Sequence, residues 1–169
     1  PIFKSSAGRA NRQGVSYLYL ASTKETAIGE IRPHPGHYVS VGKFKNNETI
    51  NVVDLRFINL MNYYRYPEEL ELFKFLRDIS EELSIPILPE EKENYLVTQF
   101  ISDIIRQIGF DGILFNSSLS DGYNLVAFNN DKFSFISSSQ SLIKIKKVEF
   151  KYKPIIYMID SFMENVKES

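Results

Sequence analysis

Two stretches in the middle of the chain repeat apolar residues at helical spacing. The first follows Pro67 and predicts an amphipathic helix, with apolar positions three and four residues apart at Leu70, Phe73, Leu76, Ile79 and Leu83. The second predicts a helix with a wider apolar face, formed by Leu96, Val97, Phe100, Ile101, Ile104, Ile105 and Ile108. Gly109 is a fitting C-terminal stop for this helix, and the segment from Pro86 to Pro89 separates the two helices.

Shorter apolar or alternating runs on both sides of these helices predict strands. Before the helices they are Ser16–Ala21, His37–Phe44 and Asn51–Arg56, and after them Gly112–Phe115, Asn124–Phe128, Phe133–Ile136 and Val148–Tyr152. Ser22 and Glu25 match a capping box and predict a short helix reaching Ile31, which Pro33 and Pro35 end. The serine-rich segment Ser137–Ser141 predicts a turn. Strands, then helices, then strands favour an α+β fold over alternating α/β winding.

The composition narrows the class of protein. The chain has 169 residues, 43% of them hydrophobic, which suits one domain with a substantial core. The absence of cysteine excludes disulfides, thiolate zinc sites and a cysteine nucleophile. With 20 basic and 21 acidic residues, a general nucleic-acid or anionic-membrane binder is disfavoured. Because no apolar stretch approaches the roughly 18–20 residues of a membrane helix, we expect a cytoplasmic protein.

No repeat or linker divides the chain. We therefore expect one domain over residues 1–153, with residues 154–169 as a tail or terminal helix. The sequence begins at Pro1 and not at methionine, so we expect its natural start to have been removed.

Charged and aromatic residues gather between Gly8 and Pro33. Two arginines precede the first predicted strand, two tyrosines lie on it, and a glutamate and a third arginine follow it; they are Arg9, Arg12, Tyr17, Tyr19, Glu30 and Arg32. A guanidinium binds phosphate or carboxylate, tyrosine stacks on a planar ring, and a carboxylate stabilises developing positive charge. Together they suit an anionic ligand with an aromatic ring, such as a nucleotide. Solvated loop arginines and core tyrosines are the alternative interpretation.

A second group of polar residues ends a predicted buried strand. Asn116, Ser117 and Ser118 follow the apolar run that ends at Phe115. Such side chains are well placed to line a pocket, although from these residues alone ordinary turn chemistry is the favoured interpretation.

Two other patterns carry alternatives. His34 and His37 have no third ligand nearby, so we predict no metal site there. Lysines alternate with aromatic residues near the C-terminus, at Lys144, Lys146, Lys147, Phe150, Lys151, Tyr152 and Lys153. This Lys144–Lys153 stripe predicts either an RNA-binding or RNA-cleaving face, or a strand edge whose charges block aggregation.

Taken together, several segments resemble the RES-domain family. They are Gly8–Asn11, Tyr17–Ala21, Thr26–Pro33 and Phe110–Ser118, with Asn124–Phe128 after them. The resemblance covers about residues 7–130, and the order and spacing of the motifs both fit. It implies an ADP-ribosyltransferase-like fold, with a split β-sheet core and flanking helices. It also implies a bacterial toxin that consumes NAD as a substrate, needs no other cofactor, and is paired with a helix-turn-helix antitoxin.

The same resemblance implies roles for individual residues. By motif position the family arginine falls on Arg9, the ring-stacking tyrosine on Tyr19, the glutamate on Glu30 and the serine on Ser117. We take Glu30, Arg9 and Ser117 as catalytic. We expect further contacts with NAD from Tyr17, Arg12, Arg32, Asn116 and Ser118. Many family members carry another arginine upstream of Gly8, and this chain has none there.

Family members split or phosphorolyse NAD at the nicotinamide bond, or transfer ADP-ribose to a protein. The resemblance therefore implies an NAD glycohydrolase or phosphorylase here, with protein ADP-ribosyltransfer from the same site as the alternative. A further alternative is a domain that binds NAD without converting it.

Overall fold

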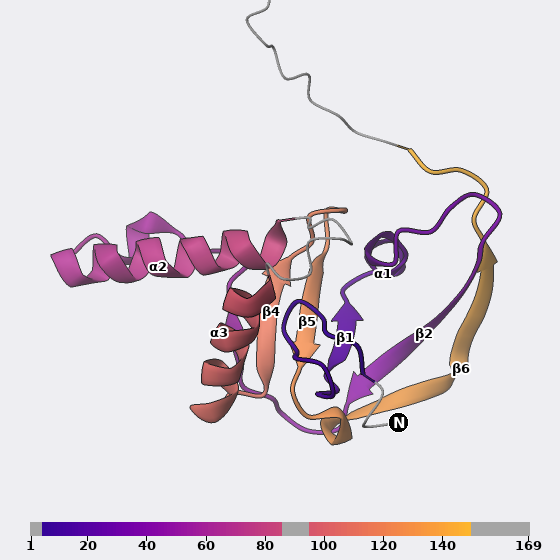
Figure 1. Ribbon diagram of the computed structural model, residues 1–169, viewed down its shortest axis with the longest axis horizontal. Helices are drawn as coiled ribbons and strands as arrows, with labels where there is room; N and C mark the ends of the chain where they lie inside the picture. Colours follow the sequence, from indigo (N-terminus) through magenta and orange to yellow (C-terminus); the bar gives the residue numbers. More distant parts are fainter. Residues whose placement is uncertain (1–4, 86–94, 150–169) are drawn as a thin grey trace, which may run out of the picture.

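A four-stranded sheet forms the centre of the protein, and a separate two-stranded ribbon lies beside it (Figure 1). The computed structural model describes residues 5–85 and 95–149. In the sheet the strand order is β1 (Leu18–Ala21), β5 (Tyr123–Ala127), β4 (Gly112–Asn116) and β3 (Val52–Asp54). Only the β3–β4 pair is parallel. The ribbon pairs β2 (Tyr38–Asn46) with β6 (Phe133–Lys144). The predicted α+β class with a split sheet is confirmed.

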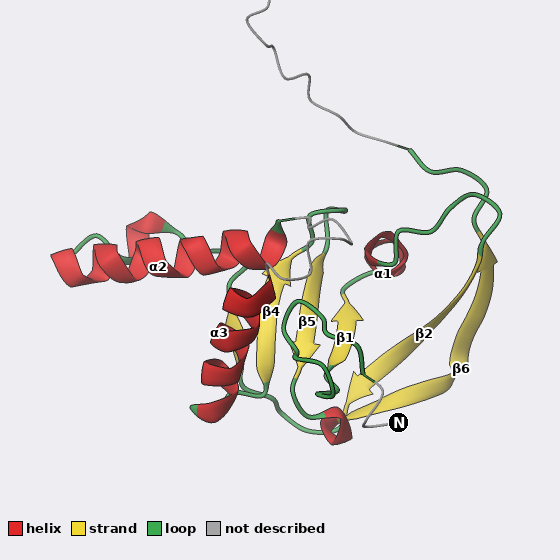
Figure 2. Cartoon of the chain, viewed as in Figure 1, coloured by secondary structure: helices red, strands yellow, loops and turns green. Residues whose placement is uncertain are grey.

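Helices flank the sheet unequally (Figure 2). Two longer ones, α2 (Pro67–Ser84) and α3 (Leu96–Gln107), lie at the side away from the ribbon. The short α1 (Lys24–Glu30) lies between the sheet and the ribbon. Two single turns of 3-10 helix, Leu60–Asn62 and Asn130–Lys132, occupy connections. The two mid-chain helices predicted from apolar spacing are thus present, and Gly109, with a φ of 97°, follows the second as its stop.

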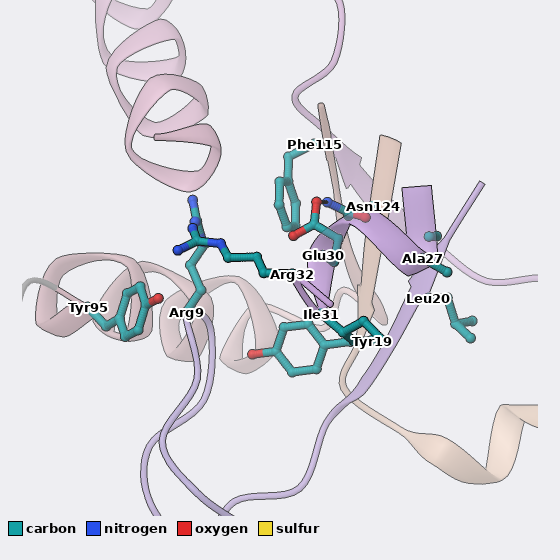
Figure 3. Close-up of a pocket in the computed structure, with 11 residues that line it drawn as sticks. Arg9, Tyr19, Leu20, Ala27, Glu30, Ile31, Arg32, Tyr95, Phe115 and Asn124 are labelled. Carbon is teal, nitrogen blue, oxygen red and sulfur yellow. Dashed lines mark hydrogen bonds between the residues drawn. The ribbon is translucent and has the colours of Figure 1, made fainter. Parts of the chain in front are cut away.

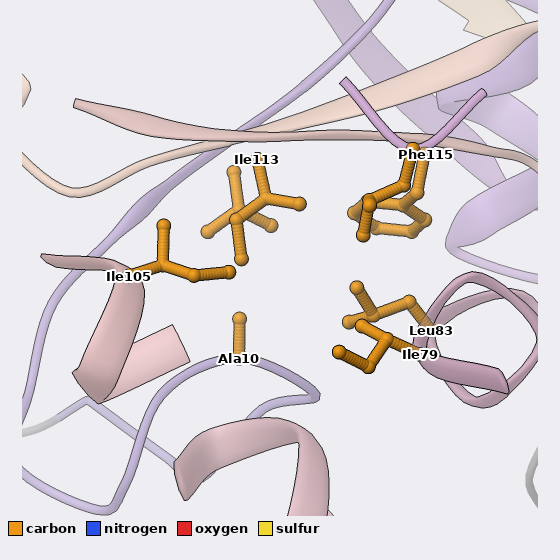
Figure 4. Close-up of a cluster of buried hydrophobic side chains, with 8 residues drawn as sticks. Ala10, Ile79, Leu83, Ile105, Ile113 and Phe115 are labelled. Carbon is orange, nitrogen blue, oxygen red and sulfur yellow. The ribbon is translucent and has the colours of Figure 1, made fainter. Parts of the chain in front are cut away.

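The core lies between the sheet and the two longer helices (Figure 4). In Figure 4, Phe115 of β4 faces Ile79 and Leu83 of α2, and Ile113 of β4 lies nearer Ile105 of α3; all five side chains are buried. Ala10 completes this cluster from the N-terminal loop and is 1% exposed. The loop that carries Arg9 is therefore fixed to the core by its next residue.

The start of α1 differs from the predicted capping box. The N-cap is Thr23 and not Ser22, since the Thr23 hydroxyl accepts a hydrogen bond from the Thr26 amide at 3.1 Å. Ser22 has another partner, because its hydroxyl accepts from the Tyr123 amide at 3.0 Å and ties the end of β1 to β5.

The turn predicted at Ser137–Ser141 is wrong. These residues lie within β6, a strand of twelve residues that pairs with the nine-residue β2 and has a register shift opposite Val41–Lys43. At this bulge the Ser139 hydroxyl donates to the Ile136 carbonyl and accepts from the Lys43 amide at 2.7 Å. The serine hydroxyl thus satisfies backbone groups that the bulge leaves unpaired.

The strand predicted near the chain end is absent from the two of its residues that the structure describes. Val148 and Glu149 lie outside any strand, so the strand predicted at Val148–Tyr152 does not begin where expected. The rest of that strand and the predicted tail or helix at 154–169 lie outside the described residues.

Candidate functional site

A cavity of about 430 Å³ opens where α1 ends, between the sheet and the N-terminal loop (Figure 3). Its lining comes from the Arg9 loop, β1, α1, β4, β5 and the residue before α3. The lining residues are Arg9, Tyr19, Leu20, Ala21, Ala27, Glu30, Ile31, Arg32, Tyr95, Phe115 and Asn124. One pocket thus contains four of the predicted site residues, which come from different segments of the chain: Arg9, Tyr19, Glu30 and Arg32.

The Glu30 carboxylate is held by two donors on the same oxygen. Its Oε1 accepts from the Ser117 hydroxyl at 2.8 Å and from the Asn124 side-chain amide at 2.7 Å. The other oxygen, Oε2, makes no hydrogen bond or ion pair within the described part of the chain, and it points away from Asn124 in Figure 3. One oxygen is therefore anchored, and the other is left for a ligand.

Ser117 reaches the pocket only through Glu30. Its hydroxyl donates to Glu30 and accepts from the Leu119 amide at 3.1 Å, so its donor is already used. Its own amide donates to the Gly122 carbonyl at 3.0 Å, which fixes the residue in the β4–β5 turn. In this arrangement Ser117 orients the carboxylate.

Asn124 is the pocket residue that sequence reasoning did not assign to the site. It lies on β5 opposite Ala21 and Phe115 and is only 7% exposed. Because a buried amide needs a partner, an asparagine directly before the apolar run Leu125–Phe128 was the available signal. The antiparallel register places that amide against the end of α1.

Arg9 is positioned from α3. The Thr98 hydroxyl donates to the Arg9 carbonyl at 2.6 Å, and the Gln99 amide donates to the Gly8 carbonyl at 2.8 Å. The Arg9 guanidinium donates through Nη1 to the Leu83 carbonyl at the end of α2, and lies 5.9 Å from the Tyr95 ring centre. Carbonyls at a helix C-terminus attract cations, so this contact holds the guanidinium at the pocket wall.

Arg32 adopts a backbone conformation that is unusual for a side-chain-bearing residue. Its φ is +46°, in the left-handed region, and it follows Ile31, the C-cap of α1. For a residue other than glycine this costs about 1–2 kcal/mol, and such strain concentrates at functional sites. Figure 3 shows Arg32 and Arg9 reaching toward each other. Neither makes an ion pair with a carboxylate among the described residues, so the pocket holds two cationic groups suited to an anionic ligand.

Tyr19 has a fixed hydroxyl and an open ring. The hydroxyl donates to Oδ1 of Asn11 at 2.7 Å and accepts from the Ala10 amide at 3.1 Å. Burial raises the pKa of Tyr19 to about 12. The residue is nevertheless 45% exposed, so its ring is available for stacking at the pocket. A Cβ on Gly8 would lie 2.5 Å from Oδ1 of Asn11, so this arrangement requires glycine at position 8.

A comparison with models of protein families shows which family the chain belongs to. The RES domain model matches residues 2–151 of the chain. The chain belongs to the RES-domain family. No curated protein and no solved structure matches it. The family resemblance predicted from the motifs is confirmed, and with it an NAD-related, toxin-like role at the level of the family.

Four residues expected to contact NAD lie outside the pocket of this RES domain. Arg12 forms an ion pair with Asp103 at 3.0 Å. The Tyr17 ring packs on Phe128 with ring centres 4.9 Å apart, and burial raises the pKa of its hydroxyl, which has no hydrogen-bond partner among the residues described. The remaining two are Asn116, whose amide donates to the Arg56 carbonyl at 2.9 Å, and Ser118, which lines a neighbouring hollow beside Thr23.

The structure adds little support for a metal site at the two histidines or for a nucleic-acid-binding face at the lysine stripe. The rings of His34 and His37 meet edge-on, 5.4 Å apart, and no three potential ligand residues gather around a metal position in the described ranges. In the lysine stripe, Lys144 lies over the Tyr38 ring and Lys147 pairs with Glu149 at 2.9 Å. Among the described helices, none has the length and apolar character to cross a membrane.

Proposed function

We propose that this RES domain binds NAD in the pocket and breaks the bond between nicotinamide and its ribose. The observation that carries the proposal is the half-anchored Glu30 carboxylate, with one oxygen held by Ser117 and Asn124 and the other unpaired in the described chain. In the same pocket Arg9 and Arg32 suit the pyrophosphate, and the exposed Tyr19 ring suits nicotinamide.

The chemistry needs what these side chains supply. When the C1′–N bond breaks, its electron pair leaves with nicotinamide, which departs as a neutral base, so no strong general acid is required. The ribose develops positive charge, as in glycoside hydrolysis, and a carboxylate beside it lowers the barrier. The free Glu30 oxygen would stabilise this charge and accept a hydrogen bond from the 2′-hydroxyl. Water or phosphate then attacks C1′, and an attacking water gives up a proton.

The space available fits a dinucleotide. The pocket of about 430 Å³ adjoins a second hollow of about 560 Å³ toward the ribbon. Both volumes are within the range of about 300–1,000 Å³ found for ligand sites. The two share Tyr19, Leu20, Ala21, Ala27 and Ile31, so a ligand can run from one into the other. We assign the reacting half of NAD to the first hollow, where Glu30 lies, and the adenosine half to the second.

For the acceptor we propose water or phosphate. Transfer of ADP-ribose to a protein side chain would use the same carboxylate and is the second candidate. The family's toxin–antitoxin context supports a helix-turn-helix antitoxin as the partner that controls the activity in the cytoplasm. The RNA-directed alternative through the lysine stripe predicts salt-sensitive RNA binding that is indifferent to Glu30→Gln.

Nicotinamide release from NAD by the purified chain, with and without phosphate, tests the proposal. We expect release by the natural sequence and its loss in Glu30→Gln, which keeps the size of the side chain but removes its charge. Glu25→Gln is the matched control, since Glu25 lies in the first turn of the same helix and outside the pocket. Equal release by Glu30→Gln and the natural chain would refute the proposed role. ADP-ribosylated protein equal to the NAD consumed would select the transferase.

A further inference from the structure

Helix α3 turns its apolar side outward. An amphipathic helix ordinarily buries this side against the core, yet here five large apolar residues stay accessible. Their exposed fractions are 70% for Leu96, 58% for Val97, 58% for Phe100, 42% for Ile104 and 67% for Ile108. We call these five residues the α3 stripe.

The orientation of α3 is fixed by its polar side. Thr98, Gln99 and Ser102 are buried, and the first two donate hydrogen bonds to the carbonyls of Arg9 and Gly8. Ser102 donates to the Thr98 carbonyl at 2.8 Å, and Ile105 packs in the core cluster. Rotating the helix to bury the stripe would leave these backbone and side-chain groups without partners. The stripe is therefore a lasting surface of the folded domain.

The character of the stripe points to a second copy of the same chain. It carries no charge, so two stripes face each other without repulsion. Leu96, Phe100, Ile104 and Ile108 are each four residues apart and form one ridge, the kind that interdigitates in the commonest helix–helix packing. A ridge of this kind is self-complementary across a two-fold axis, as an isologous dimer requires.

The exposed area is sufficient for such a dimer. With about 200 Å² for each large apolar side chain, the exposed fractions correspond to roughly 600 Å² of apolar surface per copy. A standard interface buries about 800 Å² per partner, little more than half of it apolar. The stripe with a polar rim meets that requirement.

The charge on the neighbouring helix restricts where the two-fold axis lies. Helix α2 has six acidic and two basic side chains, and its N-terminal half projects beyond the sheet in Figure 1. Two α2 helices placed against each other would repel, whereas two α3 helices would not. We propose that the chain forms a symmetric dimer in which the α3 stripe of one copy packs on the α3 stripe of the other.

The dimer would support the pocket without entering it. The inner side of α3 holds the Gly8–Arg9 backbone, so a partner that covers the outer side stabilises the helix that positions Arg9. The proposal concerns association alone and does not depend on the reaction at Glu30.

Sedimentation velocity of the full chain from about 1 to 100 μM tests this dimer. We expect a monomer–dimer equilibrium, and Phe100→Glu should raise its dissociation constant by more than about tenfold, because it places a charge in the centre of the contact. Val97→Lys provides a second variant of opposite charge. Leu142→Glu is the matched control, since Leu142 is 71% exposed on β6, away from α3, and should leave association unchanged.

Circular dichroism of each variant establishes that it is folded. A chain that stays monomeric throughout the range overturns the proposal. It is equally overturned if folded Phe100→Glu and Val97→Lys both retain the dimer, or if Leu142→Glu weakens it as strongly.

Discussion

Asn124→Asp tests the anchored carboxylate most directly. The substitution keeps the shape of a side chain that is 7% exposed, and replaces a donor with a second carboxylate at the 2.7 Å contact to Glu30. Two carboxylates this close do not both ionise readily, and they titrate as a pair. At an effective dielectric of 20, like charges about 4 Å apart repel by about 4 kcal/mol. Since 1.36 kcal/mol corresponds to one pH unit, and water in the partly open pocket weakens the repulsion, we expect the acid limb of the activity profile to move to higher pH by about 1–3 units.

The sign of the shift follows from the charge that the reaction needs. In the proposed reaction activity requires the ionised carboxylate, so the acid limb of the variant's pH profile should move to higher pH, with activity lost at mildly acidic pH and recovered as the pH rises. Asn124→Leu is the companion variant, because it removes the hydrogen bond without adding charge. A hydrogen bond to a charged group contributes about 1.5–3 kcal/mol, so its kcat should fall by about 10- to 100-fold without a shift of the acid limb of similar size.

The assay is the pH dependence of kcat/KM for nicotinamide release by the natural chain and both variants, with thermal unfolding as the check on folding. A profile of folded Asn124→Asp that superimposes on that of the natural chain would refute the reasoning. It would mean that the hydrogen bond between Asn124 and Glu30 is not part of the active arrangement.

Three further predictions concern other residues of the pocket. Ser117→Ala should lower kcat by about tenfold with little change in KM, because the hydroxyl contacts Glu30 and not the ligand; a rise in KM alone in steady-state kinetics would contradict this. Arg32→Gly should raise the free energy of unfolding by up to about 1 kcal/mol, since glycine tolerates the φ of +46°, while KM for NAD rises; denaturant titration and kinetics measure the two effects, and lower stability would count against the argument. Because the pKa of Tyr19 is about 12 in the folded chain and about 10 when unfolded, the unfolded state releases this proton first as the pH rises. Stability should therefore fall from about pH 10 to 12 in the natural chain and less in Tyr19→Phe, and equal losses in denaturant titrations across that range would argue against the cause.

The helices were predictable from sequence because their signals are local, but the outward side of α3 was not. Apolar spacing identifies a helix without stating what packs on it. The partners of Thr98 and Gln99 are the carbonyls of Arg9 and Gly8, about ninety residues earlier, and only the tertiary structure reveals that contact. The serine run at Ser137–Ser141 shows the same limit, because a bulge within β6, opposite Val41–Lys43, accommodates a composition typical of turns.

The part of the candidate site that lies within the family motifs was predictable from sequence. Arg9, Tyr19, Glu30 and Arg32 share the pocket, as their family motifs implied. Arg12 has the same chemistry as Arg9 but pairs with Asp103, and residue type alone does not separate the two arginines, whereas the family motif assigns Arg9. Asn124 was missed for the opposite reason, since its significance depends on a register that brings β5 to the end of α1.

The hydrogen bonds around Glu30 and Arg9 have one physical consequence in common. A carboxylate and two guanidinium groups that line one pocket would, if unrestrained, collapse into ion pairs and leave nothing for a ligand. Ser117 and Asn124 hold the carboxylate, and the Leu83 carbonyl holds Arg9; among the described residues neither arginine pairs with Glu30. Opposite charges are thus kept apart at fixed positions, which suits the proposed reaction of a ligand that is anionic in one part and becomes cationic in another. Such fixed charges need no reorganisation when the transition state forms. The backbone strain at Arg32 fits this arrangement. Glycine would adopt the positive φ at lower cost, yet the chain has an arginine there, at the wall of the pocket.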